Sequence, residues 1–308
     1  MNKLVFPLLP VLALAVACKK NCHVNTDEVR LQTMKTTDSS GNVITLTFPY
    51  DQQNRIAGYV YTGANGTSTN GASVVYLGNE ITIYYTPVKS STLNNSTVVW
   101  YKLNANNVPD RRIETDLLNV NDGTVQQIET TTDTTDYFYD ASGLLTKATG
   151  SYFDSTWYKD NRSIPQRETN RTRYTRDYTN SNNMMTQIVV NKTESYIAWR
   201  SGTIYTGGTT TDGKYTFEYN HKYPNKTDFN NAVVLAEFGV IFNSEYLMNK
   251  AYAYIPDKVS YAETVKYSSG TPTSTSSSNS VNLTWGYNKY GFVSSMIDSY
   301  KHDFIYNY

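Results

Sequence analysis

Four short stretches of the chain share one pattern, in which two aromatic residues separated by one position are followed by Asp or Asn. The stretches are residues 48–51, 137–140, 217–220 and 285–288. Aromatic residues two positions apart point to the same face of a β-strand. The Asp or Asn can open a type I turn by accepting a backbone N–H two residues on, and Asn or Gly three positions later tolerates the left-handed conformation. The pattern therefore predicts hairpins, with the Asp or Asn starting a turn rather than binding a ligand.

The third copy departs from the pattern, because Tyr223 follows Asn220 where Gly or Asn is expected, and Pro224 comes next. Its connection must therefore differ from the other three. The copies begin 68 to 89 residues apart. This irregular spacing excludes the fixed period of a solenoid or a propeller. The motif instead indicates hairpins that recur within one large sheet.

The composition indicates an all-β chain built as a large antiparallel meander. The sequence contains 28 Tyr residues together with many Thr and Ser, and Tyr and Thr favour pleated, half-buried surfaces. Residues 43–50 alternate apolar and polar side chains, as a strand does. Turns are expected at residues 207–208 and 212–213, and the Ser- and Thr-rich residues 268–280 are expected to form an exposed loop.

One segment, near residues 230–250, has a helical rather than a strand pattern. It contains the most apolar run outside the N-terminus, residues 233–242, with Val234 and Phe238 on a rough helical stripe. The sequence predicts a short helical insertion that packs on the sheet or plugs a barrel mouth. Glu237 is the best single candidate for an acid with a perturbed pKa, and a solvent-facing helix position is the alternative.

The N-terminus predicts export and lipidation. Residues 1–17 have a charged start, an apolar run and small residues before Cys18, which is typical of a secretory signal peptide and too short for a membrane span. Cys18 resembles the acylated Cys of a bacterial lipobox, although Ala15 stands where Leu is usual. We expect a signal peptide at 1–17, a flexible tether at 18–35 and a single β domain at 36–308. The remaining Cys22 lies in the tether, so no structural disulfide is expected.

The layout resembles a family of uncharacterised Gram-negative bacterial lipoproteins with a porin-like fold. The residues that carry the resemblance are the lipobox, the meander of Tyr-Asp hairpins, the apolar insertion at 230–250 and the final hairpin. The hairpin at residues 139–145 also resembles the YD-repeat units of Rhs-like surface proteins. The resemblance covers most of residues 40–308 and implies a sheet curled into a barrel or half-barrel. That family has no assigned activity, so the resemblance implies no functional residue.

The sequence offers little for catalysis, metal binding or nucleic-acid binding. Its three His residues are scattered, and it has no metalloprotease helix, paired-Cys zinc site, nucleophile elbow or phosphate-binding loop. Lys and Arg equal Asp and Glu in number, which disfavours a nucleic-acid partner. We therefore expect no catalytic residue, no cofactor and no metal, and favour a non-enzymatic protein. Glu263 is expected to face solvent or a lumen beside a cation.

Three functional hypotheses remain open. The favoured one is an exported lipoprotein of the outer membrane, anchored through Cys18 on the periplasmic or the surface side, that binds a glycan or an envelope protein without catalysis. A second is a carbohydrate-active enzyme with two carboxylates in a cleft. A third is a membrane-embedded barrel, suggested by the terminal aromatic residues of 304–308. The candidate glycan platform consists of Trp100, Trp157, Trp199 and Trp285, whose alternative role is to fill the core.

Overall fold

The described residues form one large β-sheet, a two-stranded ribbon and one short helix. The computed structural model describes residues 30–37, 40–90, 92–160, 166–221, 223–224, 232–237, 252–268, 274–289, 292–297 and 301–307. The strands are β1 (Arg30–Thr37), β2 (Val43–Thr47), β3 (Gly58–Thr62), β4 (Ser68–Leu77), β5 (Glu80–Tyr85), β6 (Val88–Lys89), β7 (Leu93–Leu103), β8 (Pro109–Asn121), β9 (Val125–Tyr139), β10 (Leu145–Asp160), β11 (Gln166–Ser181), β12 (Met184–Arg200), β13 (Thr203–Glu218), β14 (Tyr223–Pro224), β15 (Tyr254–Ile255), β16 (Lys258–Tyr267), β17 (Ser274–Asn282), β18 (Thr284–Tyr287), β19 (Val293–Ile297) and β20 (Lys301–Asn307), and the helix is α1 (Ala232–Glu237). The all-β prediction is confirmed.

The start of the β domain lies earlier than the sequence indicated. The expected signal peptide, Cys18 and the first part of the expected tether lie outside the described residues, but residues 30–35 already belong to β1. Leu31 and Met34 are buried there. A register shift between Leu31 and Thr33 breaks the alternation by which a strand is recognised in a sequence. The tether therefore does not extend to residue 35.

The main sheet curls into a nearly closed antiparallel barrel. β1 pairs with β2 on one side and with β20 on the other, and β13 pairs with β16 across the insertion. β17 pairs with β16, β18 pairs with β19, and only Leu283 separates β17 from β18, so one bent strand joins the two parts. The described sheet has 18 strands, or 17 when β17 and β18 count as one. The predicted meander curled into a barrel is confirmed.

The strand pairing also explains how the two ends of the chain meet. β5 and β6 both pair with β7, so they are two pieces of one passage along the wall. If β5 and β6 count as one strand, and β17 and β18 as another, the described sheet has 16 passages. An even number lets the first and last strands pair antiparallel, as β1 and β20 do.

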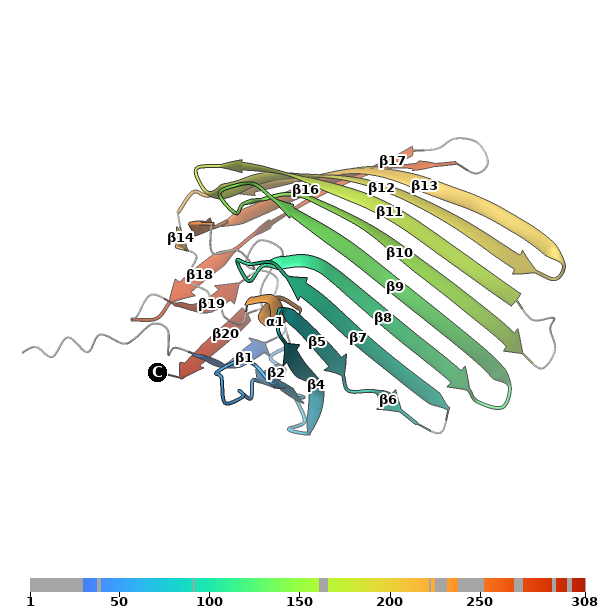
Figure 1. Cartoon of the computed structure of the whole chain (residues 1–308), viewed down its shortest axis with the longest axis horizontal. Coiled ribbons are helices and arrows are strands. Elements are labelled where there is room, and N and C mark those ends of the chain that lie inside the picture. Colours follow the sequence, from blue (N-terminus) through green and yellow to red (C-terminus); the bar gives the residue numbers. More distant parts are fainter. Residues whose placement is uncertain are drawn as a thin grey trace, which may run out of the picture.

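The barrel is taller on one side than on the other (Figure 1). Strands β8 to β13 have 13 to 17 residues, whereas β18 has only 4. At about 3.3 Å per residue, the long strands reach roughly 45 to 55 Å. They extend past the short strands and form a curved wall with a concave inner face.

Turns of the sequence motif gather at one end of the barrel, which we call the base. At Asp51, the Oδ1 atom accepts the backbone N–H groups of Gln53 and Arg55, each at 2.9 Å. Asp140 holds the backbone N–H groups of Ser142 and Leu144 in the same way, and the left-handed residue that closes this turn is Gly143, with φ of 83°. The first and last described residues, Arg30 and Asn307, pair with each other at the base. The opposite end, where residues 122–124 and 201–202 connect strands, we call the rim.

In three copies of the motif, the Tyr directly before the Asp or Asn ties the base to a neighbouring strand. The hydroxyl groups of Tyr50, Tyr139 and Tyr219 donate to backbone carbonyls of Leu31, Pro109 and Met185, at 2.7 to 2.8 Å. The third copy differs as expected. There the side chain of Asp257, which follows β15, accepts the backbone N–H groups of Asn220 and His221 in place of a local turn. The hairpin interpretation of the motif is therefore confirmed for the described turns.

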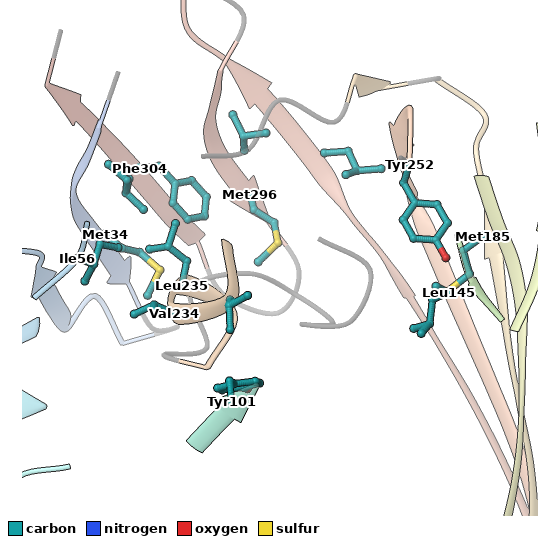
Figure 2. Close-up of a cluster of buried hydrophobic side chains, with 14 of the residues drawn as sticks. Met34, Ile56, Tyr101, Leu145, Met185, Val234, Leu235, Tyr252, Met296 and Phe304 are labelled. Carbon is teal, nitrogen blue, oxygen red and sulfur yellow. The ribbon is translucent and has the colours of Figure 1, made fainter. Parts of the chain in front are cut away.

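The apolar core fills the base, and α1 lies inside the barrel there. Ala232 to Leu235 are buried. Figure 2 shows Val234 and Leu235 next to Met34, Met296 and Phe304, with Tyr101 on the other side of the helix and Leu145, Met185 and Tyr252 in a second group. Burying each such Leu, Val or Met stabilises the fold by roughly 1.5–3 kcal/mol. The predicted helical insertion is confirmed for residues 232–237, and its other residues lie outside the described ones.

The two faces of the long wall differ in chemistry. Its inner face is apolar near the base, where Tyr137, Ala148 and Phe217 are buried, and becomes polar toward the rim, where Thr131 and Asp154 are buried. The outer face carries mainly Thr and Ser with scattered charges. The polar part of the inner face is therefore the place to look for a site.

Two sequence expectations for the wall are wrong. Residues 207–208 and 212–213 do not turn but lie within β13, where 207–208 pair with β12 and 212–213 pair with both β12 and β16. Residues 274–280 of the expected Ser-rich loop form β17, which pairs with β16. Neighbouring strands supply the ladder hydrogen bonds in both cases, and these outweigh the weak strand preference of Gly and Ser.

Candidate ligand-binding site

A hollow of about 420 Å³ lies on the polar inner face, over strands β10 to β13 and β16. Most of its residues belong to two neighbouring cross-strand rows. One row runs from Tyr152 through Glu194 to Tyr267, and the other runs from Asp154 to Tyr196. The hollow is lined by Tyr152, Asp154, Asn170, Thr172, Glu194, Ser195, Tyr196, Gly208, Thr209 and Tyr267.

The ring of Tyr196 lies over β13, because its cross-strand partner there is Gly207, which has no side chain. A Cβ atom at position 207 would stand 2.4 Å from Cε1 of Tyr196, closer than any side chain allows. Because Gly207 has no side chain, the Tyr196 ring can pack against the backbone of β13. Since 41% of Tyr196 remains exposed, the hollow offers a partly open aromatic surface.

Two carboxylates stand beside that ring, and each is held by neighbours. Asp154 accepts hydrogen bonds from Nδ2 of Asn170 at 3.1 Å and from Oγ1 of Thr156 at 3.2 Å. Glu194 accepts from Oγ1 of Thr209 at 2.6 Å and pairs with Lys192. Burial opposes the charge of Glu194, but the hydrogen bonds from Lys192 and Thr209 lower its pKa below the usual value. Glu194 is therefore an ionised hydrogen-bond acceptor at neutral pH.

A second hollow, of about 590 Å³, lies nearer the base, between β3, β4, β5, β7 and β8. Tyr59, Tyr61 and Tyr85 line it together with Thr97 and Glu114. Burial raises the pKa of Glu114 above its usual value, although the adjacent Arg112 works in the opposite direction. This hollow thus combines aromatic rings with a carboxyl group that gains a proton more readily than usual.

An ion cluster separates the second hollow from α1. Arg112 binds Glu237 through two hydrogen bonds, from Nε to Oε2 at 3.0 Å and from Nη2 to Oε1 at 2.9 Å. Tyr101 donates to Glu237 Oε2 at 2.5 Å, and Nη2 of Arg112 also reaches Glu114 at 2.6 Å. Burial, followed by the charge of Glu237, raises the pKa of Tyr101 well above its usual value. Glu237 is thus a paired anion that fixes α1 to the wall, and the solvent-facing alternative is wrong.

The structure does not bring the four Trp residues together as a platform. Trp285 is buried at the base, where its Nε1 donates to the carbonyl of Pro256 at 2.8 Å. Trp100 lies on the outer face and donates to Glu80. Trp157 and Trp199 also lie on the outer face, with Arg167 between them in one row. None of the four lines the inner hollows.

Glu263 faces the lumen, which was one of its two expected positions, but hydroxyl groups rather than a cation bind it. Tyr261 donates to it at 2.5 Å and Ser277 at 3.1 Å. Among the described residues, no group of three or more His, Cys, Asp or Glu is arranged to hold a metal ion. In the same part of the chain, no helix is long and apolar enough to cross a membrane.

Sequence reasoning missed the inner hollows because their residues come from five strands. Tyr152 and Asp154 are two positions apart on β10 and therefore share its inner face. This spacing was the one sign of the hollow that the sequence offered. The partners Asn170, Glu194 and Tyr196 join them only through the cross-strand register.

Comparison with known proteins gives structural resemblances at low sequence identity. No family model matches the sequence, and no curated protein matches it. A porin-like protein from Bacteroides uniformis ATCC 8492 is 12% identical, with a TM-score of 0.42 over 89% of this chain and 96% of that one. OmpT, an outer membrane protein of Vibrio cholerae, is 8% identical, with a TM-score of 0.28 over 90% of this chain and 97% of that one. With TM-scores below 0.5, neither resemblance bears on the site of this chain.

Proposed function

We propose that the protein is an exported, non-catalytic binding protein whose inner hollow takes an oligosaccharide. The observation that carries the proposal is the pairing of an exposed aromatic ring, Tyr196, with the charged acceptors Asp154 and Glu194 in one hollow. A sugar ring has apolar C–H faces and a rim of hydroxyl groups. Ligand sites of this kind combine apolar surface with a few fixed polar groups that orient the ligand.

The chemistry of the hollow matches those two requirements. Tyr196 supplies an aromatic face, and Tyr152 and Tyr267 stand on either side in the next row. Hydrogen bonds to ionised acceptors contribute about 1.5–3 kcal/mol each, more than bonds between neutral groups. Asn170 and Thr209 hold the two carboxylates in place, so the site loses little freedom when it binds a ligand.

The outer face of the long wall supports a barrel surrounded by water rather than by lipid. A membrane-embedded barrel needs a continuous outward apolar band. Here the middle of β11 points Arg171 and Arg173 outward, and β13 points Asp212 and Lys214 outward. Each Arg or Lys at the bilayer midplane costs about 2–4 kcal/mol. The barrel form agrees with the embedded alternative, but these side chains favour a barrel outside the hydrocarbon.

For the cellular location, we propose lipid anchoring through Cys18 at the outer membrane. Both ends of the described barrel lie at the base, so an anchor before residue 30 would attach there and leave the rim free. The anchor is tested by partition of the exported protein into a detergent phase. Wild type should enter that phase and Cys18→Ala should stay in water. Equal partition of the two would refute the anchor.

Binding is tested on a glycan array, followed by calorimetry with the best oligosaccharide. Tyr196→Ala and Asp154→Asn should each weaken binding about tenfold or more, equivalent to about 1.4 kcal/mol. Tyr84→Ala is the matched control, since Tyr84 is a similarly exposed Tyr on the outer face. Wild-type affinity in both inner-face variants, or no glycan bound by the wild type, would contradict the proposal.

Glycoside hydrolysis is a second candidate function, and the observation in its favour is Glu114 in the second hollow. Asp116 follows two positions later on the same face of β8, roughly 6.6 Å along the strand. Inverting glycosidases use two carboxyl groups about 6.5–9.5 Å apart, and two positions on one strand face can present such a pair. The raised pKa of Glu114 suits a general acid. If this alternative holds, hydrolysis of glycosides should be detectable and should disappear in Glu114→Gln.

A further inference from the structure

The outer face near the rim carries a cross-strand row of four apolar residues and one Arg, over five adjacent strands. Ile128, Trp157, Arg167, Trp199 and Ile204 pair in succession from β9 to β13. Neighbouring strands lie about 4.8 Å apart, so the row extends roughly 19 Å around the wall. Its two Trp residues flank a single Arg. The row lies outside both inner hollows.

The aliphatic residues of this row are unusually open to water. Ile204 is 68% exposed and Ile128 is 43% exposed, and Ile197, two positions before Trp199 on the same face, is 54% exposed. Leu117 lies in the next row toward the base and is 40% exposed. Single exposed apolar residues are ordinary, but a contiguous group marks an interaction surface.

Positive charge accompanies this apolar surface. Arg167, Arg171 and Arg173 all point outward from β11 and are exposed, and Lys159 points outward from β10. In the described part of β10 and β12, no Asp or Glu occupies an outward position. On β11 the outward acid is Asp177, about 13 Å along the strand from Arg173. The four cations, from the rim to the middle of β11, are therefore not neutralised by adjacent carboxylates on these strands.

We infer that this surface, which we call the outer stripe, docks on an anionic lipid bilayer. The outer stripe consists of Ile128, Trp157, Arg167, Arg171, Arg173, Ile197, Trp199 and Ile204. In docking, the Ile side chains enter the boundary of the hydrocarbon, the Trp rings lie at the headgroup level, and the Arg side chains bind lipid phosphates. The barrel then lies on its side, with its inner hollows facing away from the lipid.

The exposed Ile side chains favour a bilayer over a dissolved anionic polysaccharide as the partner. The Arg and Trp residues would suit either partner, since both present negative charge. Ile128, Ile197 and Ile204 offer no flat ring and no hydrogen-bonding group, so they gain free energy only by leaving water. Their position on a convex wall lets them enter a soft surface together.

Side-on docking is compatible with an anchor at the base but does not require it. Twelve positions separate Cys18 from Arg30, and an extended chain of that length spans about 40 Å. An anchored barrel could therefore lie down on the same membrane. Without an anchor, the outer stripe would attach the barrel reversibly by its own charge and apolar surface.

The test uses the full-length protein bound to vesicles that contain brominated phospholipids, which quench nearby Trp fluorescence. Phosphatidylglycerol vesicles should quench the wild type strongly, and phosphatidylcholine vesicles should quench it weakly. Reversal of the three charges, in Arg167→Glu/Arg171→Glu/Arg173→Glu, should weaken docking about 100-fold or more, at about fivefold for each Arg near an anionic surface. The quenching of this charge-reversed variant should fall to the level of the double variant Trp157→Phe/Trp199→Phe, which lacks the two Trp residues of the outer stripe.

Matched controls separate docking from a general effect of charge or from misfolding. Lys214→Glu also reverses an exposed cation on the outer face, but outside the stripe, and it should dock like the wild type. Ile197→Ser/Ile204→Ser should reduce quenching without changing charge. Far-ultraviolet circular dichroism checks that each variant keeps its sheet. Wild-type quenching in the charge-reversed variant would overturn the inference, as would competition by dextran sulfate with no difference between the two lipids.

Discussion

The ion pair between Arg112 and Glu237 should account for a measurable part of the stability of the barrel. Only 15% of the Arg112 side chain and 10% of the Glu237 side chain are exposed. Removing one partner of such a pair leaves the other charge buried without compensation, which costs about 3–5 kcal/mol. We expect Glu237→Leu to lose about 3 kcal/mol, the low end of that range, because Arg112 keeps its contact with Glu114. In a domain of this size the loss lowers Tm by roughly 6–12 °C.

A double-mutant cycle in urea isolates the pair itself. The single variants Arg112→Met and Glu237→Leu should each be strongly destabilised. The double variant should lose less than the sum of the two, with a coupling energy of about 1–3 kcal/mol, because it leaves no unpaired charge. Lys266 and Asp212, an exposed pair at 3.0 Å on the outer face, provide the control. Their coupling should lie between about 0 and 1 kcal/mol.

Two results would refute this reasoning. One is a loss below about 1 kcal/mol in Glu237→Leu, which would mean that α1 does not depend on the ion pair. The other is additivity of the two single variants, which would mean that the charges act independently. In either case, apolar packing of residues 232–235 alone would hold the helix.

Three further predictions concern the base. Gly143→Val should lose about 1–2 kcal/mol in thermal unfolding, because φ is 83° at that position and the left-handed conformation is costly for a branched side chain. Trp285→Phe should lose about 1–3 kcal/mol, since the carbonyl of Pro256 loses its donor. Burial opposes the charge of Asp257, but hydrogen bonds from His221 and Asn220 lower its pKa. Its contribution to stability should therefore be complete above pH 3.8 and lost as the pH falls below it, so the difference between wild type and Asp257→Asn should shrink in acid.

Much of the base could be predicted from the sequence because its signals are local. The Asp or Asn that opens each turn and the residue with positive φ that closes it lie within four positions, so one short stretch of sequence contains the whole turn. A further turn of the same kind, at Asn104, was missed. Its Oδ1 accepts the backbone N–H groups of Asn106 and Val108, and Asn107 has φ of 59°. Leu103 stands there in place of the motif Tyr, so the chemistry of the turn persists without the aromatic signature.

The long wall was harder to predict because its order comes from neighbouring strands. The glycines of residues 207–213 favour turns by themselves, yet pairing with β12 holds all of them in β13, and β16 also pairs with Gly213. The Ser-rich β17 likewise has no apolar face and becomes a strand by pairing with β16. Hydrogen bonds between distant segments overrode local preference in both cases.

The sequence by itself determined that this chain is all-β, that its hairpins turn at Asp51, Asp140 and Asn288, and that a helix interrupts the meander before residue 250. These features follow from spacing within a few residues, which is where turn geometry and side-chain alternation act. Only the tertiary structure decided that β1 pairs with β20, that Glu237 binds Arg112, and that Tyr196 and Asp154 share a hollow beside a glycine. Those contacts depend on strand register and barrel curvature, which are set by the packing of the whole sheet rather than by any single stretch of sequence.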